Sequence, residues 1–313
     1  MNDIIINERQ AEITFKREVT AEIGDRFIKY LDARPKSIAT YRASIRKMLE
    51  YLTTANITAP TRCDILAYRD ELKQKYSPAT VSLHITACRL FFRWTAQEGI
   101  YPNIADHIKG AKLETGFKKD YLIADQAKNI LSCINTDTIS GKRDYALITL
   151  MITSGLRCIE VSRANIEDIR TAGGSVVLYI QGKGKDDKGE YIKLSASVEM
   201  AIRQYLNARG EKDGKAPLFS SESNNSKANR LTTRSISRIV KQRMKTAGYD
   251  SDRLTAHSLR HTAATLNLLN GGTEKETQQL LRHKNINTTM IYSHDLERAR
   301  NNSEYRISAA IGL

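Results

Sequence analysis

The chain has 313 residues, 41% of them hydrophobic, which is enough for two globular domains with buried cores and excludes an intrinsically disordered protein. Its formal net charge of +14 is typical of proteins that bind a polyanion such as nucleic acid, the alternative being a generically basic surface. Apolar runs are too short to span a membrane, the first residues do not resemble a signal peptide, and the 4 cysteines form no CxxC pair, so we expect reduced thiols and a cytoplasmic protein.

The pattern of apolar residues predicts two domains. We expect a flexible lead over residues 1–18, a helical domain over residues 19–112, and a second domain over residues 113–313 that ends in a tail. A basic connector from Lys109 to Lys119 separates the domains, and we place the boundary within a few residues of Thr115. The connector either lies along a phosphate backbone or is a solvated tether.

Four amphipathic helices are predicted in the first domain. We expect Ser37 to cap the second helix, Thr61 and Asp64 to form a capping box before the third, and Ser77 to cap the fourth, with Pro78 at its first position. The outward faces carry basic residues that we predict to contact DNA: Arg42, Arg46, Arg89 and Arg93. The front half is therefore expected to be a compact all-helical domain.

The second domain mixes helices with a short β-region. Helices are predicted around residues 126–134, 145–154, 198–206 and 233–247. Two β-branched and aromatic runs, Val176–Ile180 and Tyr191–Leu194, predict strands joined by a glycine-rich hairpin over residues 182–189 that carries several lysines. The fold class expected is mainly α with a small antiparallel β-sheet.

One predicted helix, over residues 233–247, has a pronounced basic stripe. No acidic residue occurs between Lys227 and Lys245, although solvated helix faces normally intersperse both signs. The alternative is a face that is merely solvated. We favour DNA contact by four residues at helical spacing: Arg234, Arg238, Lys241 and Lys245.

An arginine follows a glycine break at Gly155. Arg157 stands where a new helix is expected to begin, and Glu160 follows on the same face. A helix start and an arginine both favour a phosphate group. Taken alone, the pair also fits an ordinary surface ion pair.

A second polar cluster lies near the C-terminus. His257 and Arg260 begin one amphipathic helix, His283 falls at the exit of the next, and Tyr292 follows nine residues later. Fixed cations stabilise the crowded, doubly charged state of a phosphodiester in transfer, and a tyrosine hydroxyl can act as the nucleophile. The cluster therefore indicates phosphodiester chemistry.

A zinc site is the competing interpretation of the histidines. His257 and His261 stand four residues apart, as in zinc-binding helices, but Ser258 occupies the position where HExxH requires glutamate, and Arg260 would repel a cation. We therefore interpret His261 as a packed core histidine and expect no metal site. No carboxylate cluster that would hold magnesium is apparent either.

These motifs together resemble the tyrosine recombinases, the phage-integrase and Xer-like family. The resemblance rests on five segments, which are His257–Thr262, Leu281–His283, Thr288–Tyr292, Gly155–Glu160 and Gly182–Lys185. The four front helices resemble the SAM-like core-binding domain of that family. The resemblance covers nearly the whole chain, and its six catalytic positions occur in the family's order.

The resemblance implies that Tyr292 attacks the scissile phosphate and leaves a 3′-phosphotyrosine and a free 5′-hydroxyl. Arg157 and Arg260 would hold the phosphate. Because the covalent bond conserves the energy of the cut strand, rejoining would need no ATP, metal or other cofactor.

The other family positions imply supporting roles. Lys183 would protonate the leaving 5′ oxygen, His257 would act as general base or hydrogen-bond partner, His283 would support the transition state, and Glu160 would be a supporting acid. Lys185 lies in the same loop and is the alternative general acid.

The sequence departs from the family pattern at one motif position, where Arg282 replaces the glycine that usually precedes the second histidine. The front of the chain is also too short for the arm-site-binding domain of larger integrases, so we expect a simpler recombinase that needs only core sites.

The expected function is site-specific recombination of duplex DNA core sites by a homotetramer assembled through the C-terminal tail, for integration or excision of a mobile element or resolution of replicons. DNA-bending or directionality factors are conceivable partners, and a bacterial or phage protein associated with the nucleoid is expected. The alternatives are a telomere resolvase or type IB topoisomerase-like strand transferase, and a DNA-binding regulator without catalysis.

Overall fold

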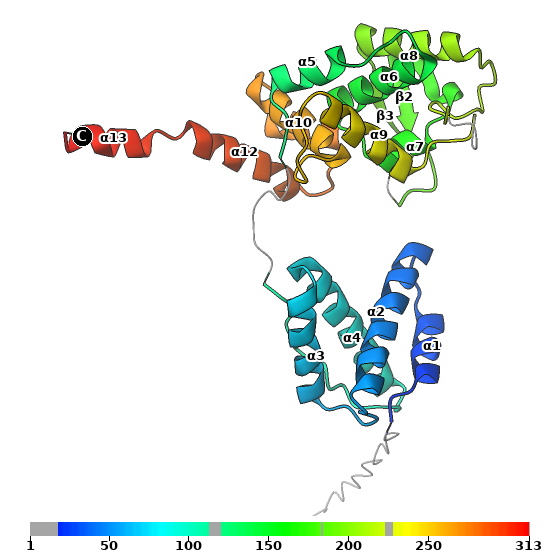
Figure 1. Ribbon diagram of the computed structural model, residues 1–313, viewed down its shortest axis with the longest axis vertical. Helices are drawn as coiled ribbons and strands as arrows, with labels where there is room; N and C mark the ends of the chain where they lie inside the picture. Colours follow the sequence, from blue (N-terminus) through cyan, green and yellow to red (C-terminus); the bar gives the residue numbers. More distant parts are fainter. Residues whose placement is uncertain (1–17, 113–119, 183, 223–227, 313) are drawn as a thin grey trace, which may run out of the picture. The chain divides into compact units, whose positions relative to one another are not determined.

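The computed structural model describes residues 18–112, 120–182, 184–222 and 228–312, except for the side chains of residues 294–300 (Figure 1). The chain divides into two compact units, residues 1–115 and 116–313. Most of the expected lead, the boundary residue Thr115 and the Lys118–Lys119 part of the connector lie outside the described residues. No helix among those described is long and apolar enough to cross a membrane.

The first unit consists of four helices, α1 (Ala21–Tyr30), α2 (Pro35–Thr54), α3 (Arg62–Lys75) and α4 (Pro78–Gln97). The capping box of Thr61 and Asp64 is present, and Ser77 caps α4 by accepting from the backbone N–H of Thr80. The expected cap at Ser37 is wrong. The helix α2 begins earlier because Pro35, whose fixed φ suits the first turn, occupies its first position.

An aromatic cluster forms the core of the first unit. Phe27 of α1 packs edge-on against Phe91 of α4 at 5.5 Å between ring centroids, and Trp94 lies 5.6 Å from Phe27. All three side chains are buried, and α2 packs along α4 beside them. The helices thus bury one shared apolar face and leave their basic faces outside.

The second unit contains the remaining elements. Its helices are α5 (Ala124–Ser132), α6 (Ile139–Ser154), α7 (Cys158–Arg163), the short 3-10 helix η1 (Ile166–Asp168), α8 (Ala196–Arg209), α9 (Thr233–Thr246), α10 (Ala256–Leu269), α11 (Glu274–Leu281), α12 (Asn287–Arg300) and α13 (Ser303–Ala310). Its strands are β1 (Ile169–Ala172), β2 (Ser175–Ile180) and β3 (Glu190–Lys193). This confirms the predicted fold class.

The sheet is antiparallel in the order β1-β2-β3, with Leu178 of β2 paired to Ile169 and Ile192. The sequence analysis missed β1. Its signal is the pair Gly173 and Gly174, both with positive φ (55° and 73°), which suits the two-residue turn of a tight hairpin. The strand itself is too short for its alternation to stand out.

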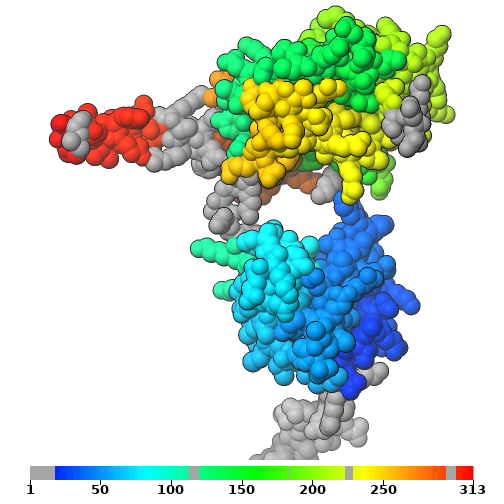
Figure 2. Space-filling view, viewed as in Figure 1, coloured from blue at the N-terminus to red at the C-terminus, as the bar shows by residue number. Residues whose placement is uncertain are grey.

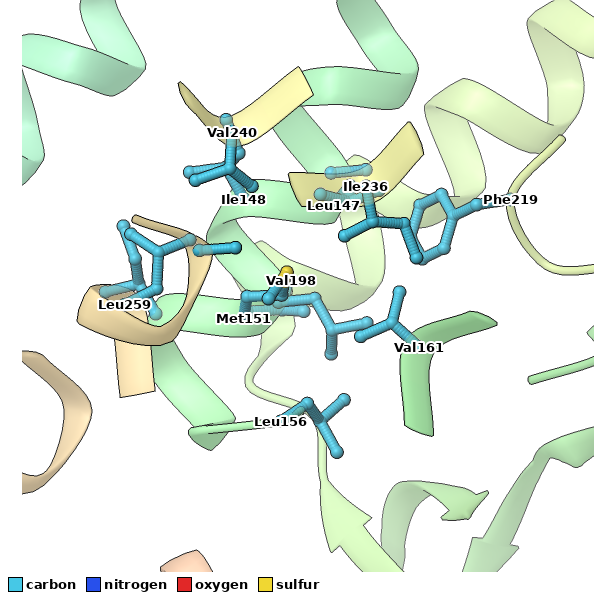
Figure 3. Packing of buried hydrophobic residues seen from close by; sticks show 14 of the residues in the cluster. Leu147, Ile148, Met151, Leu156, Val161, Val198, Phe219, Ile236, Val240 and Leu259 are labelled. Atoms are coloured by element: carbon cyan, nitrogen blue, oxygen red, sulfur yellow. The ribbon is translucent and has the colours of Figure 1, made fainter. Parts of the chain in front are cut away.

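Helix α6 is the centre of the second unit. Leu147, Ile148 and Met151 are completely buried, and Figure 3 shows them among apolar side chains from surrounding elements, including Leu156, Val161, Val198, Ile236, Val240 and Leu259. Helices α8, α9 and α10 all contact α6. This packing fixes the end of α6 and the start of α10, the two places from which the polar cluster begins.

Candidate active site

A cleft of about 570 Å³ in the second unit brings the predicted side chains together. Its walls include all the predicted catalytic and supporting residues that the structure describes, namely Arg157, Glu160, His257, Arg260, His283 and Tyr292. Lys183 lies outside the described residues. The walls also include Lys185, the alternative general acid, and side chains to which the sequence analysis gave no catalytic role: Glu190, His261 and Arg282.

The position of Arg157 is set by a tight break between α6 and α7. Gly155 closes α6 with a left-handed φ of 60°, and a side chain there would lie 2.6 Å from Leu281. Arg157 is the N-cap of α7, and its backbone N–H donates to Glu160 Oε2 at 2.8 Å. Its Nη1 donates to Glu160 Oε1 at 2.9 Å, while the side chain stays 29% exposed at the cleft.

Glu160 is not part of a surface ion pair, because its side chain is only 1% exposed. Its second partner is Arg282, whose Nη2 lies 2.9 Å from Glu160 Oε2. Burial opposes ionisation of Glu160, but the charges of Arg282 and Arg157, together with the Arg157 backbone hydrogen bond, outweigh it and hold the pKa below its ordinary value. Glu160 is therefore a carboxylate bridging two arginines.

Arg260 is the largest fully buried side chain among the described residues. Its Nη1 donates to the carbonyl oxygen of Gly155 and its Nη2 to that of Leu281. Burial lowers the pKa of this guanidinium, and the neighbouring charges of Arg157 and Arg282 lower it further. Arg260 thus ties the segment that carries Arg157 to the segment that carries His283.

His283 leaves α11 directly after a left-handed residue. Arg282 adopts φ 55° and ψ 45° at the C-cap, the conformation that glycine adopts most readily, so this departure from the family motif keeps the backbone geometry. His283 Nδ1 lies 2.9 Å from Oγ1 of the buried Thr289. Burial and the charges of Arg260, Arg157 and Arg282 lower the pKa of His283 to about 4, so the ring is neutral at pH 7.

The two histidines of α10 occupy different environments. The ring of His257 is exposed at the cleft, and its centroid lies 4.7 Å from that of His261, which is buried. Desolvation lowers the pKa of His257, and the charges of Arg260 and Arg157 lower it further. The lowered pKa favours the neutral ring of His257, which has a nitrogen able to accept a proton.

Tyr292 lies on α12 with 5% of its surface exposed. Its ring centroid is 5.4 Å from that of His261. Burial raises the pKa of its phenol to about 12, although the charges of Arg260 and Arg157 act in the opposite direction. The hydroxyl is therefore neutral at pH 7, and a nucleophilic attack by its oxygen requires a proton acceptor.

The lysines of the β2–β3 hairpin differ in their partners. Lys185 Nζ lies 2.8 Å from Glu190, and Lys188 Nζ lies 2.6 Å from the buried Asp168. Both lysines are therefore paired with carboxylates.

The predicted DNA-binding residues are on the surface, except for two that are half-buried. Arg42, Arg46 and Arg93 are exposed in the first unit, whereas Arg89 is half-buried and donates to Thr86 Oγ1 at 3.3 Å.

On α9, which lies on the surface of the second unit (Figure 2, yellow), Arg234 and Arg238 are exposed. Lys241 is half-buried, and both Lys241 and Lys245 are paired with Asp250, at 3.5 and 2.9 Å. Two of the four basic residues are therefore paired with an acidic residue that follows the acid-free run in the sequence.

Two family models match this chain, and proteins similar to it are known. The model of the "Phage integrase family" matches residues 120–298, and the model of the "Phage integrase, N-terminal SAM-like domain" matches residues 25–99. Tyrosine recombinase slr0733 of Synechocystis sp. is 33% identical over 231 residues, covering 73% of this chain and 72% of that protein. Tyrosine recombinase XerC of Pelobacter propionicus is 30% identical over 267 residues, covering 83% and 85%.

Two solved structures have the same fold. The XerH site-specific recombinase bound to difH substrate has a TM-score of 0.67 at 23% identity, covering 84% of this chain and 79% of that one. The lambda integrase tetramer bound to a Holliday junction has a TM-score of 0.68 at 20% identity, covering 88% and 77%.

Proposed function

The chain belongs to the phage integrase family of tyrosine-type site-specific recombinases, enzymes that cut and rejoin DNA, and on that premise we propose that Tyr292 is its nucleophile. The Tyr292 oxygen attacks the scissile phosphorus, the bond to the 5′ oxygen breaks, and a 3′-phosphotyrosine forms. The observation that carries the proposal is the single cleft in which Tyr292 meets Arg157, Arg260 and His283.

The raised pKa of Tyr292 and the lowered pKa of His257 suggest how protons move during cleavage. Because the Tyr292 phenol is neutral at pH 7, its proton leaves as the new bond forms, and His257 is the neutral acceptor in the same cleft. The departing 5′ oxygen takes a proton from a hairpin lysine. Lys183 is our choice, because Lys185 and Lys188 are both engaged with carboxylates. The reverse sequence rejoins the strand.

Charge stabilisation is the task of the arginines and His283. The Arg157 side chain reaches the cleft from a frame fixed by Glu160, and His283 offers one N–H whose tautomer depends on Thr289. Such preorganised donors stabilise the negative charge that builds on the non-bridging oxygens. The chemistry needs no ATP, because the phosphotyrosine conserves the energy of the cut strand.

Assembly on DNA is the second part of the proposal. In the solved structures, XerH recombinase is bound to difH substrate, a lambda integrase dimer to a core site, and a lambda integrase tetramer to a Holliday junction. We infer that this chain also forms a homotetramer on two duplex core sites, in the cytoplasm, with α13 docking on a neighbouring protomer. None of the residues of α13 is buried, and Ile307 and Ile311 are 62% and 67% exposed, which leaves their apolar surface for a partner copy.

The test is strand transfer between two labelled duplexes that carry the DNA sequence the protein selects from a random library. We expect recombinant products in excess EDTA and without ATP. Relaxation of supercoiled DNA or hairpin closure by a monomer, without recombinants, would instead favour a topoisomerase-like or telomere-resolving role. Recovery of activity only on adding magnesium or zinc would contradict the proposed mechanism.

A further inference from the structure

We propose that Arg282 is a positioning residue for DNA cleavage, which acts through Glu160 to hold Arg157 and His283 in one frame. The inference rests on the proposed function and goes beyond the residues assigned there. Arg282 neighbours His283 in the sequence, yet its guanidinium binds a side chain 122 positions earlier in the chain.

The backbone at Arg282 is the first observation. Its φ of 55° lies in the left-handed region, which is unfavourable for a residue with a Cβ atom. Glycine would satisfy this turn at lower conformational cost. An arginine in such a place bears a conformational cost that a favourable interaction of its side chain can offset.

That interaction is a buried junction. The Arg282 side chain is 9% exposed, its Nη2 donates to Glu160 Oε2 at 2.9 Å, and its Nη1 donates to the Leu280 carbonyl at 2.7 Å. The same Glu160 oxygen accepts the backbone N–H of Arg157 at 2.8 Å. One carboxylate oxygen thus joins the N-terminus of α7 to the turn between α11 and α12.

Charge balance is the second consequence of the junction. Glu160 with Arg157 alone would form a neutral pair, and its carboxylate would offset the charge that Arg157 presents at the cleft. With Arg282 added, the three groups carry a net positive charge of one. Arg282 can then neutralise Glu160, and the charge of Arg157 remains for the phosphate. Arg282 also shares charge effects with Glu190, Arg260 and His283. Three more charged groups line the same pockets, namely Lys185, Lys275 and Lys284.

The junction also affects the pKa values of Glu160 and His283. The Arg282 charge is the largest of the influences that lower the pKa of Glu160 against its burial, and it contributes to the low pKa of His283. Removing Arg282 raises the pKa of both groups. Glu160 then takes up a proton at a higher pH than before, and its contact with Arg157 loosens there.

The test compares the wild type with Arg282→Gly on a nicked duplex carrying the sequence that the wild type selects from random DNA. Glycine suits the backbone, so the variant is expected to melt cooperatively at a temperature close to the wild-type value. We expect covalent adduct to form about tenfold more slowly or worse, the usual scale for a lost supporting partner, with the acid limb of the rate profile moved to higher pH.

Two further variants separate positioning from general damage. Glu160→Gln combined with Arg282→Gly should be no slower than Glu160→Gln alone, because Arg282 acts through that carboxylate. Arg282→Lys keeps the charge but replaces the two donor nitrogens, Nη1 and Nη2, with a single Nζ. It should retain the wild-type acid limb of the pH–rate profile and cleave at a rate between those of the wild type and Arg282→Gly.

Wild-type rate and pH profile in Arg282→Gly, or strictly additive effects in the double variant, would overturn the inference. If Arg282→Gly does not fold, Arg282→Lys decides: slower cleavage with normal melting supports the positioning role, and unchanged cleavage refutes it. Adduct formation by the wild type separates these outcomes from failure of the proposed function, which would abolish adduct in every variant.

Discussion

The rings of Tyr292 and His261 pack against each other at a tilt in the second unit, with centroids 5.4 Å apart and an interplanar angle of 51°. Both side chains are buried, at 5% and 9% exposure. Burial, helped by the charges of His257 and Arg260, lowers the pKa of His261 to about 4, so Tyr292 packs against a neutral ring. This core histidine is therefore part of the wall behind the proposed nucleophile.

The free energy of unfolding should decrease in mild acid because His261 and His283 are held in the neutral form. The pKa values of His261 and His283 are about 4 in the folded chain and about 6.5 in an unfolded one, so between these values the unfolded state binds protons that the folded state does not. The stability contributed by the neutral rings is fully present above about pH 7 and is lost progressively as the pH falls toward 4.

The variant His261→Phe tests this dependence, since it keeps a ring and removes one titrating group. We expect a shallower loss of melting temperature between pH 7.5 and 5 by calorimetry. His107→Asn is the matched control, because His107 is exposed and its left-handed φ of 53° suits asparagine. Equal slopes in the wild type and His261→Phe would show that His261 titrates normally.

Replacing Arg157 or Arg260 with alanine should have different effects on the stability of the fold. Arg157→Ala and Arg260→Ala are each expected to slow cleavage about a hundredfold or more, as for other lost charged donors in a transition state. Arg260→Ala should also lower the melting temperature, because the buried carbonyls of Gly155 and Leu281 lose their donor. Single-turnover rates and melting curves check this, and equal melting temperatures would contradict the structural role of Arg260.

The basic stripe of α9 divides into two pairs with different expected effects. Replacing Arg234 and Arg238 with glutamine should reduce the log–log salt slope of DNA binding by about two, one for each phosphate contact. The same change at Lys241 and Lys245 should reduce it less, because Asp250 already pairs with both. A slope that neither pair changes would place the stripe away from DNA.

Truncation after Arg306 tests the tail. Because α13 has no buried residue, the shortened chain should melt like the wild type and bind a single site with unchanged affinity. Complexes of two duplexes with several protomers should be lost in gel-shift assays, and cleavage should change. Unfolding, or normal assembly and recombination, would reject docking of α13 on a neighbour.

The helical elements were predictable where local chemistry decides them. The capping box at Thr61, the cap at Ser77 and the glycine stop at Gly155 act within a few residues, so the sequence analysis located those helix ends. The start of α2 was misplaced because a serine was preferred over Pro35. Strand β1 was missed although its glycine turn was visible.

The junctions of the cleft could not be derived in the same way. The spacing of Arg157 and Glu160 suggested a pair, but nothing local shows that Glu160 is buried or that Arg282 is its second partner. Likewise, Asp250 lies beyond the acid-free run that made α9 stand out. These contacts join segments far apart in the sequence or separated by a turn, and only the packing brings them together.

The most direct test of the central claim is covalent trapping on a nicked duplex from which the cut strand cannot be rejoined. We predict that the wild type forms an adduct in EDTA whose peptide map places the DNA on Tyr292. We predict that Tyr292→Phe binds the same duplex equally well and forms none. Adduct formation by Tyr292→Phe, or a wild-type linkage to another residue such as Tyr305, would contradict the assignment of Tyr292 as nucleophile.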